Sequence, residues 1–466
     1  MLHEDRLLPS DPSQRAIARR LYAEIRNLPI VSPHGHTDPA WFAENQRFPN
    51  PAALFVIPDH YVFRMFYSQG IRMEDLGVPR ADGGAVETDP RKIWRRFADN
   101  WYLLRGTPSR MWLDHAFAEV FGLDQAFGPK TADAFYDHID ACLAKPEFRP
   151  RALFERFNIE VLATTEAATD PLVHHRALKQ SGWTGRVVTT FRPDAVVDPE
   201  FEGFAANLDA LSAASGEDTG TWTGYLRALA ARRAFFKTMG ATATDHGHLN
   251  ATTADLSQDE AAKLYARARK GELSAAEADL FRGQMLTEMA RMSLDDGLVM
   301  QIHPGAFRNH NRPVFERFGR DKGCDIPIRT EYVAALKPLL NRFGNEPGLT
   351  IIVFTLDETT FSRELAPLAG HYPALRLGPP WWFLDSPEGM RRARETAIET
   401  AGFYNTVGFN DDTRAFCSIP ARHDVARRID CGFLARLVAE HRLGEDEARE
   451  VAVDLTYTLV KKAYRL

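Results

Sequence analysis

Short runs of β-branched and aliphatic residues recur along the chain, separated by longer segments whose apolar residues are spaced three and four apart. The short runs show little alternation of polar and apolar positions, which is typical of strands buried on both faces. The longer segments have the periodicity of amphipathic helices. The pattern predicts eight strands, at residues 28–31, 159–164, 186–191, 241–245, 298–303, 349–356, 375–378 and 406–410.

Capping residues mark several of the predicted helix ends. Ser274 and Glu277 have the spacing of a capping box, in which each side chain accepts a hydrogen bond from the backbone of the other. Ser386 followed by Pro387 fits an N-cap and a first helical position. Gly402 stands where a glycine would end the same helix. These signals support the helical assignment of the longer segments.

The alternation of strands and helices predicts a parallel sheet, and eight such units close a (β/α)8 barrel. The spacing is uneven, because about 125 residues separate the first two strands, far more than one crossover helix needs. We therefore predict an α/β fold, a (β/α)8 TIM-like barrel with a large helical insertion after the first strand. Its expected parts are an N-terminal segment with the first strand (1–39), a helical subdomain at the barrel mouth (40–150), and the remainder of the barrel with helical inserts (151–466).

Side chains that suit a metal follow the first and last predicted strands, where the active sites of such barrels form. His34 and His36 point to the same side of an extended backbone, so both imidazoles can bind one divalent cation. Asp411 and Asp412 follow the last strand, which lies beside the first once a barrel closes. Either carboxylate can complete the metal site and act as a base. The alternatives are surface histidines and a turn or N-cap aspartate.

Further polar and aromatic candidates follow the other strands or lie in the insertion. Each has a structural alternative: a plain helix for the pair in the insertion, a satisfied core histidine, an ion-paired arginine, or a tryptophan packed in the core. No lysine that could be carboxylated to bridge two metals follows the fourth strand, and this favours a single metal. These candidates are His60, Tyr61, Arg192, His246, His303 and Trp381.

Composition narrows the range of functions. The 466 residues are 44% hydrophobic and 26% charged, which is typical of a globular protein. A net charge of −6 without a basic cluster speaks against a nucleic-acid partner, and the chain has no apolar run long enough for a membrane span. The four cysteines form no CxxC pair, and the first residues lack the apolar core of a signal peptide, so we expect a cytoplasmic protein. No glycine-rich nucleotide-binding motif is present.

Taken in chain order, these motifs resemble the uronate isomerase family, the glucuronate/galacturonate isomerase branch of the amidohydrolase superfamily. Two positions depart from the family pattern, since Asp411 replaces a threonine and Pro304 replaces an aliphatic residue. The resemblance extends from about residue 30 to residue 430 and rests on His34-Gly35-His36, Asp59-His60-Tyr61, Phe191-Arg192-Pro193-Asp194, Asp245-His246-Gly247, His303 with Arg308-Asn309, Trp381-Trp382-Phe383, Asp412-Thr413-Arg414-Ala415-Phe416 and Arg422-His423.

The resemblance implies a sugar-acid isomerase with one divalent metal. The family interconverts D-glucuronate with D-fructuronate and D-galacturonate with D-tagaturonate. Motif register selects Asp412 over Asp411, so the implied metal ligands are His34, His36 and Asp412. Zinc is the expected ion, and manganese also suits mixed histidine and carboxylate ligands. The residues that the resemblance places around the sugar are His60, Tyr61, Arg192 and Arg414.

An aldose–ketose isomerisation through a cis-enediol moves one proton between C2 and C1 and another between the two oxygens. We assign Asp412 as the carbon base and Tyr61 as the hydroxyl-proton shuttle, with His303 in reserve. Arg192, Arg414 and His60 are expected to bind the substrate carboxylate, and Trp381 to line the sugar site.

Two other functions stay open at this point. One is a mononuclear metal-dependent hydrolase of the amidohydrolase superfamily, in which His303 or His246 is a further metal ligand. The other is a non-catalytic binder of sugar acids. The expected partners are small-molecule uronates, with no nucleic acid and no membrane, and the sequence is compatible with a homo-oligomer.

Overall fold

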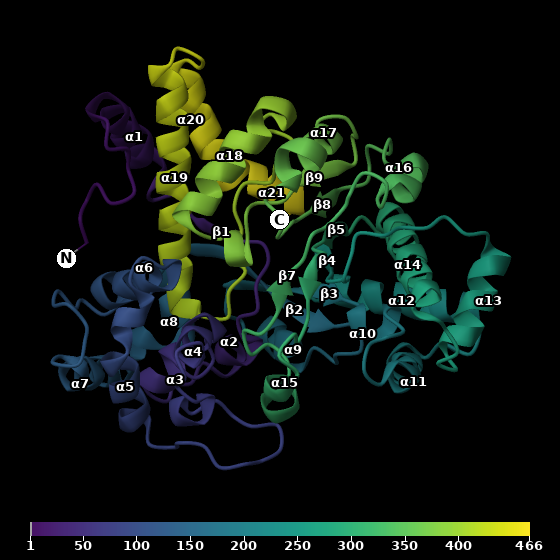
Figure 1. Ribbon diagram of the computed structural model, residues 1–466, viewed down its shortest axis with the longest axis horizontal. Helices are drawn as coiled ribbons and strands as arrows, with labels where there is room; N and C mark the ends of the chain where they lie inside the picture. Colours follow the sequence, from purple (N-terminus) through teal and green to yellow (C-terminus); the bar gives the residue numbers. More distant parts are fainter. Residues whose placement is uncertain (1) are drawn as a thin grey trace.

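A curved parallel sheet is the centre of the molecule (Figure 1). The computed structural model describes residues 2–466. All neighbouring strands of the large sheet are parallel, and their order is β1-β2-β3-β4-β5-β8-β9. These strands are β1 (Ile30–Ser32), β2 (Ile159–Ala167), β3 (Arg186–Arg192), β4 (Ala243–His246), β5 (Val299–Ile302), β8 (Ile351–Val353) and β9 (Leu375–Leu377).

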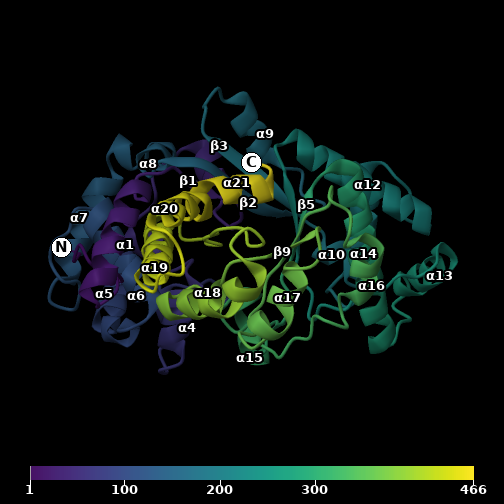
Figure 2. The same ribbon diagram turned by 90° about the horizontal axis from the view of Figure 1, so that it is seen from above.

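Helices surround the sheet on its outer side (Figure 2). Strand β1 is buried throughout, as are β4, β5 and β8, which explains why their sequences show no polar alternation. The covering helices are α1 (Pro12–Ile25), α9 (Val173–Gln180), α10 (Asp194–Val197), α11 (Phe204–Ser215), α12 (Trp222–Thr238), α13 (Gln258–Ala268), α14 (Ala275–Asp296), α16 (Lys337–Phe343), α17 (Ala366–Ala369), α18 (Pro387–Ala401), α19 (Ile419–Ala439), α20 (Glu445–Val453) and α21 (Leu459–Tyr464).

The predicted TIM-like barrel is confirmed, but the strand expected at 406–410 is wrong. That segment is reduced to one bridge between Leu377 and Thr406. Gly408 adopts a left-handed conformation at φ 78°, which interrupts an extended backbone. A Cβ at this position would lie 2.4 Å from Cγ2 of Val460 in α21. The other seven predicted strands form, with ends shifted by up to three residues.

The chain between β1 and β2 is helical, and it packs directly on the barrel. Its aromatic core includes Trp94, whose ring centroid lies 5.3 Å from that of Phe97 and 5.1 Å from that of Phe127. The same hydrophobic cluster includes Ile159 and Leu162 of β2. A division into a separate subdomain at 40–150 stays a prediction. The helices of this region are α2 (Pro39–Glu44), α3 (Pro51–Phe55), α4 (His60–Tyr67), α5 (Pro90–Asp99), α6 (Pro108–His115), α7 (Ala132–Leu143) and α8 (Pro150–Arg156).

The predicted helix caps are confirmed. Helix α14 begins with a capping box in which both the Ser274 and the Glu277 bonds are present. Helix α18 begins at Ser386, whose side chain accepts from the backbone N–H of Gly389, and it ends at Gly402 with φ 68°. Local sequence therefore determines where these two helices begin and where α18 ends.

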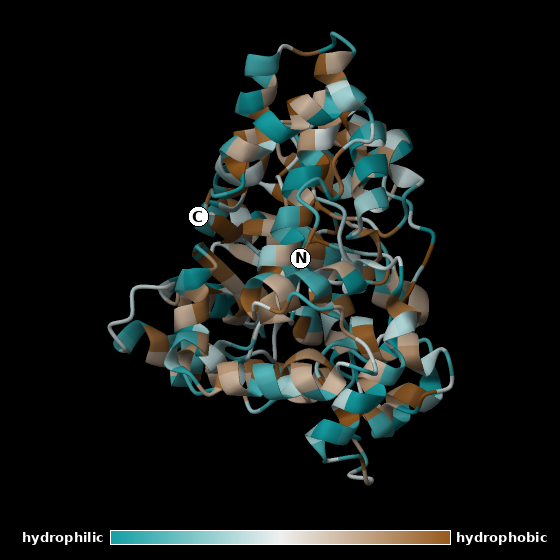
Figure 3. Ribbon diagram, turned by 90° about the vertical axis from the view of Figure 1, so that its left-hand side faces the viewer, coloured by the Kyte–Doolittle hydropathy of each residue, from teal (hydrophilic) through white to brown (hydrophobic). Residues whose placement is uncertain are grey.

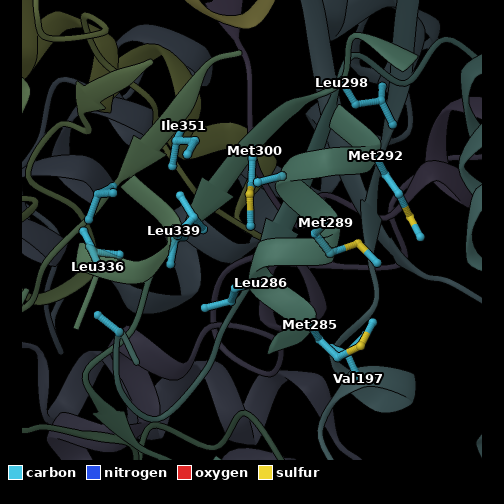
Figure 4. Close-up of a cluster of buried hydrophobic side chains, with 14 of the residues drawn as sticks. Val197, Met285, Leu286, Met289, Met292, Leu298, Met300, Leu336, Leu339 and Ile351 are labelled. Carbon is cyan, nitrogen blue, oxygen red and sulfur yellow. The ribbon is translucent and has the colours of Figure 1, made fainter. Parts of the chain in front are cut away.

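The largest apolar core lies between the sheet and the helices that follow β3, β4 and β5. Met285, Met289 and Met292 of α14 pack in one buried cluster with Met300 of β5 and Ile351 of β8 (Figure 4). Thioether side chains suit this position because they fill irregular space between a helix and a strand. Many of the helices carry both hydrophobic and hydrophilic residues (Figure 3), which suits helices that are buried on one side and exposed on the other.

A small antiparallel hairpin lies apart from the main sheet. It consists of β6 (Ala306–Phe307) and β7 (Ile326–Pro327), with α15 (Arg312–Phe318) between them. The hairpin brings residues from 308 to 325 toward the end of β5, and this position matters for the site described below. Within residues 2–466, no helix has the length and apolarity needed to cross a membrane.

Candidate active site

A cavity of about 580 Å³ collects the residues that follow the barrel strands. Its lining includes all nine residues for which the sequence predicted a catalytic, metal-binding or substrate-binding role, whereas Asp411 and His246 are not among the lining residues. The nine residues are His34, His36, His60, Tyr61, Arg192, His303, Trp381, Asp412 and Arg414.

Two imidazoles and a carboxylate meet at the ends of the first and last barrel segments. Nε2 of His34 lies 3.5 Å from Oδ1 of Asp412, and Nε2 of His36 lies 3.2 Å from the same oxygen. That oxygen is buried, and no residue from 2 to 466 hydrogen-bonds to it. An orphaned carboxylate oxygen that faces two imidazole nitrogens is a donor set that fits a divalent cation.

Backbone geometry holds this group together. The N–H of His36 donates to the carbonyl of Thr413 over 3.0 Å, which joins the first and last barrel segments beyond their strands. A Cβ on Gly35 would lie 3.4 Å from that same carbonyl oxygen, so the close approach is made easier by glycine. Asp412 itself has φ 38°, a left-handed conformation that is uncommon for residues other than glycine and that is frequent at functional sites.

Asp411 is turned away from the metal ligands. Its Oδ2 lies 2.9 Å from Nε2 of His423, and both side chains are buried. Arg422 donates to the Asp411 carbonyl over 3.1 Å and to Oδ2 of Asp385 over 2.5 Å. The geometry thus places Asp412 at the histidines, whereas the Asp411 carboxylate contacts His423 next to the buried Arg422–Asp385 ion pair, in agreement with the motif register.

A second group of potential ligands, Asp194, His246 and His248, also lies within 4.8 Å. It fits a cation less well than the first group. Asp194 already accepts from Nε of Arg192 over 2.9 Å and from the backbone N–H of Gly247 over 3.1 Å. A guanidinium so close repels a divalent cation, so His34, His36 and Asp412 are the better metal site.

Charge at the first group favours ligation. Burial would raise the pKa of Asp412, but contact with His36 and the charge of His34 outweigh it and hold the pKa well below its usual range. Burial lowers the pKa of His36 despite its contact with Asp412. An ionised carboxylate and a neutral imidazole are the protonation states that metal binding requires.

The two arginines of the cavity are held in different ways. Arg192 pairs with Asp194 at 2.9 Å and with Asp245 at 3.3 Å, so the alternative of an ion-paired arginine holds for this residue. Arg414 instead pairs with Asp321 at 3.1 Å, and both side chains of that pair are partly exposed. Arg192 is therefore fixed, whereas Arg414 has a partner that a ligand can displace.

His60 and Tyr61 enter the cavity from the start of helix α4. Asp59 caps this helix, because its Oδ1 accepts from the backbone N–H of Tyr61 over 2.8 Å. Burial and the charge of Arg414 lower the pKa of His60 to about 3, so its imidazole is neutral. Burial raises the pKa of Tyr61, which keeps the phenol protonated. The expectation of a helix here and the expectation of site residues are both consistent with this arrangement.

Asp245 is a motif residue beside the cavity to which the sequence assigned no role. Its Oδ1 lies 2.8 Å from Nε2 of His303, and it is fully buried. Strand alternation could have indicated it, since Ala243 lies in the barrel-interior cluster and Asp245 is two residues further on. His246 is buried outside the cavity lining, and its Nε2 contacts Thr244 Oγ1 at 3.0 Å, whereas its Nδ1 has no hydrogen-bond partner within residues 2–466.

The hairpin contributes residues to which the sequence assigned no role, although Arg308 is part of a quoted motif. Arg308, Asp321 and Asp325 line the cavity, and Arg308 donates to Asp325 over 2.8 Å. The guanidinium of Arg308 also lies 5.0 Å from the Trp382 ring centroid. Trp381 is buried, with its ring 5.1 Å from that of His303, so it is a wall of the cavity rather than an exposed lid.

Comparison with known proteins decides the family. A protein-family model described as glucuronate isomerase matches residues 3–464 of the chain. This chain belongs to the glucuronate isomerase family. A uronate isomerase from Rhizorhabdus wittichii is 66% identical over 465 residues, which cover 100% of this chain and 98% of the relative.

Solved structures of glucuronate isomerase family members agree in fold over the whole chain. A glucuronate isomerase from Caulobacter crescentus has a TM-score of 0.98 and 60% identity, covering 100% of this chain and 97% of its own. A uronate isomerase from Thermotoga maritima has a TM-score of 0.92 and 27% identity, covering 100% of this chain and 99% of its own. The resemblance inferred from ordered motifs is therefore confirmed.

Proposed function

We propose that this protein interconverts D-glucuronate with D-fructuronate and D-galacturonate with D-tagaturonate. The observation that carries the proposal is a single cavity lined by all nine predicted site residues, in a chain that matches the glucuronate isomerase family over residues 3–464. The substrate is a small sugar acid, and a cavity of about 580 Å³ is in the range of small-molecule sites.

In this proposal His34, His36 and Asp412 hold one divalent metal, with zinc the first choice and manganese the second. When bound, such an ion polarises and positions substrate oxygens. The buried, unpartnered Oδ1 of Asp412 and the two Nε2 atoms beside it support this assignment.

The proposed chemistry is proton transfer by this chain's own side chains. In the aldose-to-ketose direction the Asp412 carboxylate removes the C2 proton, and the C2–H electron pair becomes the double bond of a cis-enediol while O1 takes the Tyr61 phenol proton. The carboxyl group then returns its proton to C1, and O2 gives its proton back to Tyr61. A neutral phenol suits this exchange because it can both donate and accept.

Recognition of the acid is assigned to the arginines. A guanidinium can bind a carboxylate through two hydrogen bonds. Arg414 is the more adaptable of the two because its partner Asp321 is partly exposed. His60 is a third donor, Trp381 forms a wall of the sugar site, and His303 is the reserve proton-transfer group.

The remaining assignments concern the cellular setting. All four cysteines are free and buried, which supports the proposal of a cytoplasmic protein. A net charge of −6 supports the absence of a nucleic-acid partner. We also propose that residues 40–150 act as a helical subdomain at the barrel mouth, since His60 and Tyr61 reach the cavity from there. A homo-oligomer is compatible with these features.

An activity comparison tests the proposal. The purified protein is incubated separately with glucuronate, galacturonate, an N-acyl amino acid and a sugar lactone. Formation of a ketose from the uronates, with the amide and lactone unchanged, is the expected result. Hydrolysis without ketose formation would indicate the mononuclear hydrolase, and tight uronate binding without turnover would indicate the binder.

A further inference from the structure

The metal ligand His34 has a buried polar neighbour on its other ring nitrogen. Nε2 of Gln301, in strand β5, lies 3.4 Å from Nδ1 of His34. The same amide nitrogen donates to the Thr244 carbonyl over 3.3 Å. On the other side of the amide, the hydroxyl of Tyr464 donates to Oε1 of Gln301 over 3.2 Å. Gln301 and Tyr464 are 1% and 0% exposed, so no solvent competes for these bonds.

Helix α21 carries Tyr464 into the barrel interior next to Gln301. Val460 and Tyr464 belong to the same buried cluster as Val31, Val161 and other strand residues that fill the barrel interior. The next residue, Arg465, fixes the end of the helix, because it donates to the carbonyl of Gly297 over 2.5 Å. This glycine precedes β5, so the helix is fastened to the strand that carries Gln301.

We propose that Gln301 and Tyr464 are positioning residues for the metal, with Gln301 orienting the His34 imidazole and Tyr464 fixing the Gln301 amide. The inference rests on the metal site proposed above. A histidine that binds metal through one ring nitrogen usually donates the N–H of its other nitrogen to a fixed acceptor, and this sets the tautomer and the ring plane. Gln301 is the polar side chain in contact with Nδ1.

The Gln301 amide can serve both states of His34. In the orientation described, Nε2 of Gln301 faces Nδ1 of His34. This suits an imidazole that carries its proton on its own Nε2. Metal binding at Nε2 of His34 moves the ring proton to Nδ1. A Gln301 amide turned by half a rotation then presents Oε1, which accepts a hydrogen bond from this N–H. In this orientation Nε2 of Gln301 donates to the Tyr464 hydroxyl, and the hydroxyl can donate in turn to Asn410.

Asn410 is suited to be the last member of this series of hydrogen bonds. It is buried, it lies close enough to the Tyr464 hydroxyl to oppose the rise in pKa that burial causes there, and its Oδ1 has no hydrogen-bond partner within the described part of the chain. The turned amide loses its bond to the Thr244 carbonyl, and the bond to Asn410 compensates. The hydrogen-bond chain would then join His34 to the segment that carries Asp412.

Removing such an outer partner typically weakens metal binding about 10–100-fold. We therefore expect Gln301→Leu and Tyr464→Phe to raise the Zn²⁺ dissociation constant by that factor. Gln301→Glu should bind Zn²⁺ at least as tightly as the wild type, because a carboxylate accepts the Nδ1–H more strongly than an amide does. A purely space-filling role predicts the reverse order, since a buried extra charge is worse for packing than leucine.

The experiment measures Zn²⁺ affinity of the full chain by competition with a chelator, together with thermal unfolding of the metal-free protein. Gln284→Leu and Tyr265→Phe are the matched controls. Gln284 is a buried glutamine of α14, and the Tyr265 hydroxyl donates to the Thr219 carbonyl away from the cavity. The controls should lower the unfolding temperature without changing Zn²⁺ affinity.

The outcomes separate this role from the proposed function. Wild-type affinity in both Gln301→Leu and Tyr464→Phe would overturn the positioning role while leaving the metal site intact. A weaker Gln301→Glu than Gln301→Leu would also overturn it. A wild-type protein that takes up no divalent ion would remove the metal site itself, and this role with it. If Gln301→Leu does not fold, Tyr464→Phe and Gln301→Glu still decide the question.

Discussion

Nε2 of His303 lies 2.8 Å from Oδ1 of Asp245, at the carboxyl ends of two neighbouring strands. The other carboxylate oxygen lies 3.3 Å from Nη1 of Arg192. Burial would raise the pKa of Asp245, but His303, His34 and Arg192 outweigh it and hold the pKa well below its usual range. One buried, ionised carboxylate therefore fixes a histidine and an arginine of the proposed sugar site.

Asp245→Asn should reduce kcat/KM for glucuronate by roughly 10–150-fold, since contacts to a charged group contribute about 1.5–3 kcal/mol. Asp296→Asn is a matched control, because Asp296 pairs with the buried Arg233 outside the cavity. The control should lower the unfolding temperature and leave kcat/KM unchanged. Equal kinetic losses in both variants would mean that Asp245 acts only through stability.

Metal content is expected to be one divalent ion per chain. His34→Ala or chelation should abolish most activity and leave the fold intact, because the apolar barrel core does not depend on the ion. His246→Ala tests the competing group and should retain the ion. Elemental analysis that finds no metal, or two per chain, in active protein would contradict this expectation.

Asp412→Asn should reduce kcat by at least ~10²-fold, the lower end of what general-base catalysis contributes. The same variant should lose exchange of the substrate C2 hydrogen with solvent deuterium, which the wild type should catalyse at least in part. Asp411→Asn is the comparison, because Asp411 contacts His423 and does not line the cavity. If Asp411→Asn lost exchange and Asp412→Asn kept it, the base would be Asp411.

Most of the fold and of the candidate site could be predicted from the sequence. Strands buried on both faces read as apolar runs, and residues placed at their carboxyl ends must converge in a barrel. Gly408 explains the failed eighth strand, since a local apolar run does not reveal that its backbone turns left-handed beneath α21. Asp321 was missed, and Arg308 was quoted in a motif without a role, because no periodic pattern links a long hairpin to a distant cavity.

Loss of an arginine should affect the acid substrate selectively. Arg414→Met and Arg192→Met should each lower kcat/KM for glucuronate by roughly 10–150-fold and barely change the poor activity on glucose, which has no carboxylate. Arg192→Met also leaves Asp194 and Asp245 without their charged partner, so only this variant should lose stability. Equal loss on glucose and glucuronate would show that the arginines support the site and do not recognise the acid.

Stability should fall with rising pH because of Glu166, a side chain of β2 that is 10% exposed. Burial raises its pKa from 4.5 to about 7, although Thr189 donates a hydrogen bond to it. Between pH 4.5 and 7, Glu166 is therefore protonated in the folded state and ionised in the unfolded state. The resulting stabilisation is complete below pH 4.5 and is lost as pH rises through 7, a change of about 3 kcal/mol.

Glu166→Gln removes this charge, so it should stabilise the protein relative to wild type at pH 8 and have little effect near pH 4.5. Glu160→Gln on the same strand is the control with the opposite sign. Burial would raise the pKa of Glu160, but hydrogen bonds from Lys461 and Tyr457 outweigh it and lower the pKa. Its replacement should therefore destabilise the protein at neutral pH. Urea unfolding at pH 5 and pH 8 measures both differences, and a Glu166→Gln effect independent of pH would contradict the assigned titration.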